Sequence, residues 1–149
     1  MNNDTTTTGS GHLAIREEWL AGSQEEIIEP ELPIVDAHHH LWLRDGHQYY
    51  LPELIADTSS GHNIVATVFV ECNAMYRASG PAQMRPLGEV EFVNGIAAMS
   101  ASGKFGSTRA AAGIVGYADL GLGDAVEEVL GAQVAGAGGR YRGVRNSSP

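Results

Sequence analysis

The chain has 149 residues, 43% of them hydrophobic and 18% charged, a balance typical of a globular domain. The 18 acidic and 9 basic side chains give a net charge of −9, which repels phosphate backbones and argues against a nucleic-acid partner. Cys72 is the only cysteine, so an intramolecular disulfide is excluded and a reducing, cytoplasmic location is the simple expectation.

The N-terminal part of the chain predicts no membrane segment. Residues 1–11 are polar and repetitive and predict a disordered tail without the apolar core of a signal peptide. Residues 12–32 place apolar side chains among charges at near-helical spacing, which predicts a helical extension interrupted near Gly22. The longest apolar run, residues 64–70, is too short to cross a bilayer, so no membrane partner is expected.

From residue 33 onward the pattern alternates between strands and helices. Strands are predicted at residues 34–38, 64–71, 113–120 and 141–145, and helices at 52–58, 86–101 and 124–134, the last capped by Asp124. This alternation predicts an α/β fold with four parallel strands and intervening helices. Spacing alone does not choose between a (β/α)8 barrel and an open doubly wound sheet, and a complete barrel needs about 250 residues.

The clearest chemical signal is the run Asp36-Ala37-His38-His39-His40 at the end of the first predicted strand. Side chains two residues apart in a strand point the same way, so we expect His38 and His40 on one side and His39 on the other. Two imidazoles at this spacing can chelate one divalent cation, and Asp36 is a candidate to orient one of the rings. The plainer interpretation is a solvated histidine-rich loop.

Two acidic residues come at the ends of predicted strands. Glu71 ends the strand at 64–71, where burial would raise its pKa and suit it to acid or base catalysis; exposure beyond the strand end is the alternative. Asp119 has the same place on the next strand, but the Leu-Gly-Leu-Gly that follows favours a turn residue. Glu71 is therefore a candidate catalytic residue, and the role of Asp119 stays open.

Arg145 ends the last predicted strand and is the second candidate catalytic residue. A guanidinium there can hold a substrate carboxylate or polarise a carbonyl, whereas Arg140 and Arg142 are interpreted as surface charges. Cys72 follows a buried strand, a position at which a lone cysteine is more often inert than nucleophilic. The glycines of residues 121–126 lack the third glycine of a dinucleotide-binding loop, and a capped helix start explains them.

From Pro33 onward the chain resembles the amidohydrolase superfamily, in its amidohydrolase-related (amidohydrolase 2) branch of lactonase-like TIM-barrel metal-dependent hydrolases. The segments that carry the resemblance are IVDAHHHLW at the first strand, VFVE at the second, GIVGYADL at the third and YRGVR at the fourth. The resemblance implies that residues 33–149 form the N-terminal half of a (β/α)8 TIM barrel, truncated after strand four.

The resemblance also implies a function. The parent enzyme would be a hydrolase that uses metal-assisted attack of water on a small-molecule lactone or similar carbonyl substrate. His38 and His40 would be ligands of a divalent metal, with zinc as the expected ion. Some members of the branch are thought to work without bound metal. The other ligands of the family come from later strands and have no counterpart here, so the fragment itself is expected to be severely impaired or inactive.

Two further classes of function stay open. One is a non-catalytic half-barrel that forms a homo-oligomer through its open sheet edges. The other is a small doubly wound nucleotide-binding domain, for which the glycine pattern is weak.

Overall fold

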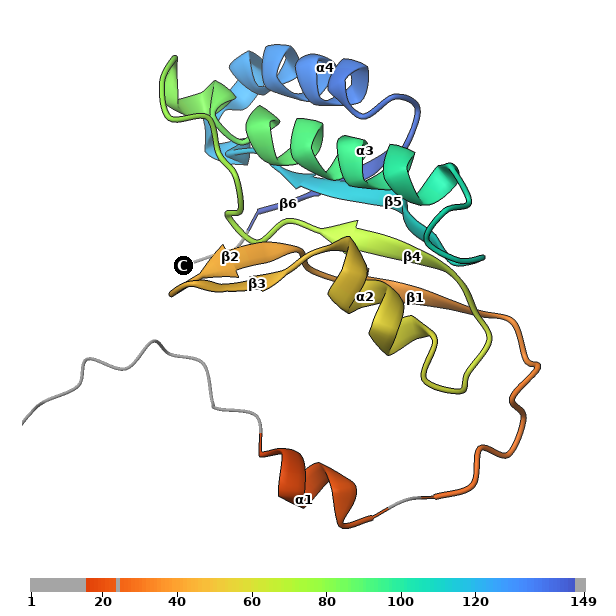
Figure 1. Ribbon diagram of the computed structural model, residues 1–149. Coiled ribbons are helices and arrows are strands. Elements are labelled where there is room, and N and C mark those ends of the chain that lie inside the picture. Colours follow the sequence, from red (N-terminus) through yellow and green to blue (C-terminus); the bar gives the residue numbers. More distant parts are fainter. Residues whose placement is uncertain (1–15, 24, 147–149) are drawn as a thin grey trace, which may run out of the picture.

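A four-stranded parallel sheet is the centre of the computed structural model, which describes residues 16–23 and 25–146 (Figure 1). Its strands are β1 (Ile34–His39), β4 (Ile64–Val70), β5 (Arg109–Tyr117) and β6 (Tyr141–Arg145), and they lie in the order β1-β4-β5-β6. Every pairing is parallel, so the carboxyl ends of the strands meet at one edge of the sheet. The predicted α/β class and the four parallel strands are confirmed.

A helix connects each pair of neighbouring strands. These helices are α2 (Leu51–Thr58), α3 (Leu87–Ala101) and α4 (Val126–Gly136). The strand order follows the chain without a reversal, and such crossovers are right-handed, so the helices gather on one face of the sheet. Figure 1 shows α3 and α4 side by side, with α3 packed along β5. Among the described strands, no reversal of order forms the crevice that a doubly wound nucleotide-binding sheet uses.

The hydrophobic core lies between the sheet and these helices. Phe69 of β4 and Ile114 of β5 are fully buried and pack with leucines and valines of the helices. The sequence explains this, because alternate residues of a strand face one side and residues three or four apart share one side of a helix. The helix residues of this core include Leu51, Leu54, Leu87, Val90 and Val93. Burying each such side chain contributes roughly 1.5–3 kcal/mol to stability.

A short antiparallel hairpin, which the sequence analysis does not predict, follows β1. It pairs β2 (Trp42–Arg44) with β3 (His47–Tyr49). Its turn, Asp45-Gly46, has φ angles of 51° and 80°, as two-residue hairpin turns require. The rings of Trp42 and Tyr49 stack across the hairpin at 6.1 Å. The Asp-Gly pair was the available signal, but strands of three residues are too short to show alternation.

The predicted bounds of β5 and the predicted cap of α4 are wrong. β5 runs from Arg109 to Tyr117 rather than from 113 to 120, and its start was missed because the alanines at 110–112 give a weak strand signal. Asp124 does not cap α4: the N-cap residue is Ala125, which makes no side-chain hydrogen bond. Asp124 instead lies inside η2 (Leu120–Ala125), a 3-10 helix that immediately precedes α4.

In the described residues of the predicted N-terminal extension, 16–23 and 25–32, the helix is short. The tail predicted at residues 1–11 lies outside the described residues, and within 12–32 the structure has the five-residue helix α1 (Glu17–Ala21). Another 3-10 helix, η1 (Ala82–Met84), precedes α3. None of the helices in residues 16–23 and 25–146 is long and apolar enough to cross a membrane.

The first turn of α3 touches the backbone of the segment that follows β4. A Cβ atom on Gly88 would lie 2.5 Å from the Met75 carbonyl oxygen and 2.8 Å from the Arg77 nitrogen. Both are backbone atoms that cannot move aside as a flexible side chain can. Asn73 and Met75 also have left-handed φ angles of 63° and 53°, which are unfavourable for residues with a Cβ. The contact at Gly88 therefore helps to hold residues 71–77 in a strained path.

We predict opposite effects for two glycine substitutions in α3. Gly88→Ala should lower the free energy of unfolding by roughly 1–3 kcal/mol, because the added methyl group overpacks the contact with Met75. A Cβ on Gly95 meets nothing within 4 Å, so Gly95→Ala should raise the free energy of unfolding by roughly 0.5–1 kcal/mol. Urea unfolding of both variants measures the difference, and equal shifts would contradict the close contact.

Candidate functional site

The residues predicted to carry chemistry lie at the carboxyl edge of the sheet. His38 and His40 are at the end of β1, Glu71 directly follows β4, and Arg145 is the last residue of β6. The structure brings them together as two pairs, His38 with His40 and Glu71 with Arg145. The backbone links the pairs, because His40 Nδ1 lies 2.7 Å from the carbonyl oxygen of Val70, the neighbour of Glu71.

The two imidazoles of the first pair present their Nε2 atoms to each other. The Nε2 atoms of His38 and His40 are 3.3 Å apart, and the rings are nearly perpendicular, at 86°. Zinc–nitrogen bonds of about 2.0–2.1 Å in a tetrahedral site place two nitrogen ligands about 3.3–3.4 Å apart. The separation of these atoms is that of a hydrogen bond between the two rings, and it also matches that of two ligands of one ion.

The contact with Val70 sets the tautomer of His40. A carbonyl oxygen accepts only, so His40 donates the Nδ1 proton to it, and in the neutral ring the lone pair is then on Nε2. A hydrogen bond from the second ring nitrogen to a backbone carbonyl is the usual support of a metal-binding histidine. Within the described residues, no cluster of three or more histidine, cysteine, aspartate or glutamate side chains could hold a metal. The pair is therefore a two-ligand arrangement.

His39 points to the other side of β1, toward the core. It is 7% exposed, its Nε2 lies 2.8 Å from the Thr67 hydroxyl, and its ring meets Phe69 edge to face. Burial lowers the pKa of His39 to about 4, so this imidazole is neutral at physiological pH. Its role is to pack the sheet against the helices.

A β-bulge in β1 allows this arrangement. Asp36 and His39 oppose Thr67 and Phe69 of β4, so β1 carries one extra residue over this stretch. The Asp36 carboxylate accepts the backbone N–H of His38 at 3.0 Å. Asp36 therefore fixes the peptide at the bulge, and this hydrogen bond orients the chain rather than an imidazole.

Glu71 and Arg145 form an ion pair that spans the end of β5, the strand between them. Arg145 Nε donates to Glu71 Oε1 at 2.8 Å, and a second guanidinium N–H donates to the Glu71 carbonyl oxygen. Glu71 is 4% exposed, whereas the Arg145 side chain is 38% exposed. The other carboxylate oxygen, Oε2, is buried without a partner among the described residues. The structure thus puts Glu71 in a buried place, and Arg145 is its counter-ion as well as an accessible cation.

The neighbouring arginines point elsewhere. Arg140 donates to the Asn94 side chain at 2.7 Å, and Arg142 is exposed and donates to the carbonyl oxygens of Gly139 and Tyr141. Arg145 is therefore the arginine of this segment that joins the carboxyl-edge pairs.

The side chains of Asp119 and Cys72 make hydrogen bonds to nearby backbone groups. Asp119 is exposed, and its carboxylate accepts the Gly121 N–H at 2.8 Å, so it is the turn residue that starts η2. Burial raises the pKa of Cys72 to about 11, so its sulfur stays a thiol, which is a poor nucleophile. The Cys72 thiol donates to the Leu41 carbonyl oxygen at 3.5 Å.

The sequence analysis missed Glu89, a buried carboxylate in the first turn of α3. It is 1% exposed, and its Oε1 accepts the backbone N–H groups of Cys72 at 2.9 Å and Ala74 at 2.8 Å. It therefore holds the segment that follows Glu71. Burial, more than any neighbour, raises the pKa of Glu89 to about 7. An acidic residue in the first turn of a helix ordinarily lies at the surface, where it interacts with the helix dipole. The position of Glu89 in the sequence therefore did not indicate that it is buried.

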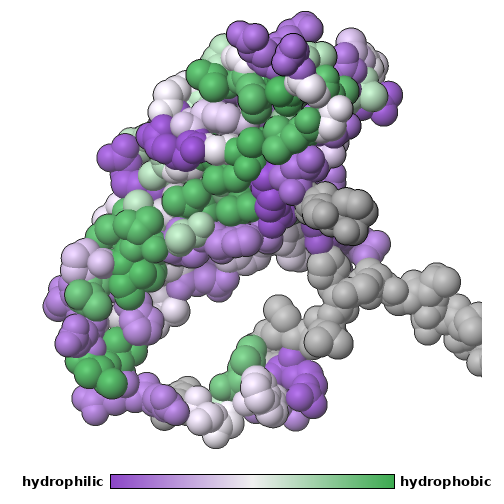
Figure 2. Space-filling model, turned by 180° about the vertical axis from the view of Figure 1, so that it is seen from behind, coloured by the Kyte–Doolittle hydropathy of each residue, from purple (hydrophilic) through white to green (hydrophobic). Residues whose placement is uncertain are grey.

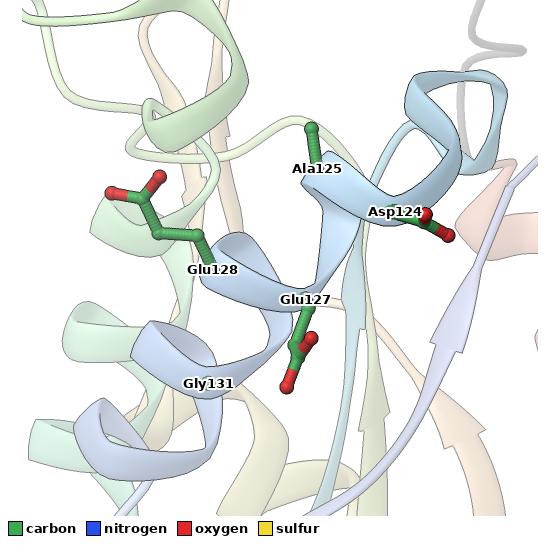
Figure 3. A pocket seen from close by; sticks show the side chains of 5 residues that line it. All are labelled: Asp124, Ala125, Glu127, Glu128 and Gly131. Atoms are coloured by element: carbon green, nitrogen blue, oxygen red, sulfur yellow. The ribbon is translucent and has the colours of Figure 1, made fainter.

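A hollow at the start of α4 is lined by five residues, Asp124, Ala125, Glu127, Glu128 and Gly131. Figure 3 shows that the three acidic side chains point in different directions and do not converge on one point. Carboxylates at this place repel phosphate, which disfavours the nucleotide-binding alternative.

Comparisons with protein-family models, with curated proteins and with solved structures found no match for this chain. The function must therefore be argued from the side chains at the carboxyl edge of the sheet.

We predict that Glu89 makes stability depend on pH. A folded-state pKa of about 7, against an ordinary value of 4.5, means that the folded chain binds this proton more tightly than the unfolded chain. The contribution stabilises the fold at low pH and is lost as pH rises from about 4.5 to about 7, by on the order of 3 kcal/mol. Glu89→Gln, which keeps an acceptor oxygen, should remove this decline in urea unfolding.

The matched control is Glu91→Gln on the same helix. Glu91 is exposed and paired with Arg77, so this variant should keep the pH dependence of the unaltered chain. The same pH profile in the Glu89 and Glu91 variants would contradict the role of Glu89.

Proposed function

We propose that this chain carries the metal-binding strand of a hydrolase with a (β/α)8-barrel architecture, which uses a divalent cation against a lactone or similar carbonyl substrate. The observation that supports this most directly is the 3.3 Å separation of the Nε2 atoms of His38 and His40, at the carboxyl end of a parallel strand. Imidazole nitrogens favour zinc among the common biological cations, with other late first-row metals as competitors.

The strand order supports the barrel part of the proposal. In such barrels each strand pairs with its neighbours in chain order, and helices cover one face only. The order β1-β4-β5-β6 has this property. Active sites of these barrels lie at the carboxyl ends of the strands, where both pairs are found.

The Nε2 atoms of His38 and His40 are suitable ligands for a divalent cation. The Val70 carbonyl keeps the His40 lone pair on Nε2, and the His38 Nε2 lies beside it. When bound there, a divalent cation supplies a Lewis acid that activates water and polarises a carbonyl oxygen. Two imidazoles alone bind zinc weakly, so strong binding takes further ligands.

Arg145 has the second role in this proposal. Its guanidinium is partly exposed, so it can donate a hydrogen bond to a substrate carbonyl or carboxylate while Glu71 holds its Nε. Glu71 has no exposed face from which to attack a substrate, since it is 4% exposed. We therefore propose Glu71 as the residue that positions Arg145, with Arg145 as the one that touches substrate.

We predict that alanine substitutions of the three consecutive histidines differ in their effect on zinc affinity. His38→Ala and His40→Ala should each reduce zinc affinity at least about tenfold in isothermal titration calorimetry, because each removes one of two ligands. His39→Ala should keep the zinc affinity and instead lower the free energy of unfolding, since His39 packs in the core. Equal zinc affinity in all three variants and the unaltered chain would overturn the ligand assignment.

Hydrolysis tests the chemical part of the proposal. With zinc present, the full chain should accelerate ring opening of simple lactones, measured as proton release, and the variant with both His38→Ala and His40→Ala should not. The rate is expected to be low because of the two-ligand site. A rate that is the same in that double variant would contradict metal-assisted hydrolysis.

A further inference from the structure

Two glutamate side chains are buried beside the segment that follows β4. Figure 2 shows the usual place of charged groups, with hydrophilic residues over much of the surface on either side of a hydrophobic band. Glu71 and Glu89 are instead 4% and 1% exposed. Burial of a carboxyl group is costly unless hydrogen bonds or an opposite charge compensate it. The contacts of these two side chains are therefore important for the segment between them.

The peptide group between Glu71 and Cys72 joins Glu89 to Arg145. Its N–H, which belongs to Cys72, donates to Glu89 Oε1 at 2.9 Å. Its carbonyl oxygen, which belongs to Glu71, accepts an N–H of the Arg145 guanidinium. Glu89 Oε1 also accepts the N–H of Ala74 at 2.8 Å, and Arg145 Nε also donates to the Glu71 carboxylate. One planar group thus has the carboxylate of α3 at one end and the guanidinium of β6 at the other.

The segment cannot move independently of the start of α3. A Cβ on Gly88 would lie 2.5 Å from the Met75 carbonyl oxygen, and the Arg77 N–H donates to the Arg85 carbonyl oxygen at 2.9 Å. Left-handed φ angles such as the 53° of Met75 persist only where the surrounding contacts fix the backbone. A change in the hydrogen bonds of Glu89 is therefore transmitted to this peptide rather than absorbed by a loose loop.

We propose that Glu89 is a positioning residue for Arg145, acting through the peptide group between Glu71 and Cys72. This group is planar and rigid, so the direction of its N–H fixes the direction of its C=O. A carboxylate accepts the N–H more strongly than a neutral carboxylic acid does, and hydrogen bonds in a chain polarise one another. Loss of the proton from Glu89 therefore makes the Glu71 carbonyl a stronger acceptor and holds Arg145 more firmly.

The consequence for binding rests on the proposed function, in which Arg145 contacts substrate. The Arg145 side chain is 38% exposed, and the N–H groups that Glu71 does not hold can donate to a substrate carbonyl or carboxylate. A guanidinium held in one orientation binds such a group with less loss of freedom. Substrate binding, rather than the chemical step, should therefore follow the protonation of Glu89.

This protonation takes place near neutral pH. Burial raises the pKa of Glu89 to about 7, although the N–H groups of Cys72 and Ala74 lower it, and the charge of Glu71 raises it further. The charged and titratable side chains around this cluster come from β2, the end of β4, the segment itself, β5 and β6: Arg44, Glu71, Cys72, Tyr76, Tyr117 and Arg145.

Nuclear magnetic resonance of the full chain over a range of pH tests the coupling. The nitrogen resonance of Arg145 Nε and the amide resonances of Cys72 and Ala74 should shift together, with one midpoint at about pH 7. Glu89→Gln should lose all three shifts, whereas Glu91→Gln, at an exposed position of the same helix, should keep them. Amide shifts in the unaltered chain without a shift of Arg145 would overturn the proposal, because Glu89 would then only hold the backbone.

A second control separates Glu89 from the histidine pair. His40 contacts the carbonyl oxygen of Val70, one residue before Glu71. The variant with both His38→Ala and His40→Ala should nevertheless keep the shift of Arg145. Loss of the shift in this variant would assign it to the imidazoles and overturn the role of Glu89.

Lactone hydrolysis with zinc present tests the part that rests on the proposed function. The KM of the unaltered chain should fall as pH rises through the same midpoint, and Glu89→Gln should lose this change in KM without a change in kcat. A KM that does not follow the Arg145 shift would overturn the role of Glu89 in substrate binding. Absence of hydrolysis would contradict the proposed function, while the Arg145 resonance still decides the coupling.

Discussion

The parallel alignment of β1, β4, β5 and β6 is the constraint on which the rest of this structure depends. Parallel neighbours cannot be joined by a tight turn, so each connection must return along the sheet through a helix. Connections of one handedness then cover one face and bring every strand's carboxyl end to one edge. Glu71 and Arg145 are 74 residues apart in the sequence and meet there across the end of β5.

The sequence predicted the parts of this arrangement that depend on local pattern. The apolar runs at β1 and β4 follow clear turn signals, and the alternation of side chains in a strand was enough to separate His39 from its two neighbours. The start of β5 was missed because alanines favour neither structure strongly. The hairpin after β1 was missed because its strands are three residues long.

The surroundings of the site could not be read from local pattern. Glu89 looks like a solvated acidic residue at a helix start, and only the return of residues 72–74 toward α3 gives its carboxylate two backbone donors. The sequence suggested that the whole guanidinium of Arg145 is available to substrate. The structure shows that its Nε already donates a hydrogen bond to Glu71, which follows another strand of the sheet. Such roles depend on contacts between segments far apart in the chain, which no spacing rule contains.

The bulge in β1 gives this strand one residue more than a regular ladder with β4 needs. Three steps of β1, from Asp36 to His39, run beside two steps of β4. A one-codon deletion of Ala37 would therefore leave a regular ladder, in which Asp36 still opposes Thr67 and His39 still opposes Phe69. Among natural variants of this chain, loss of Ala37 should be tolerated better than loss of His39, which would bring His40 opposite Phe69.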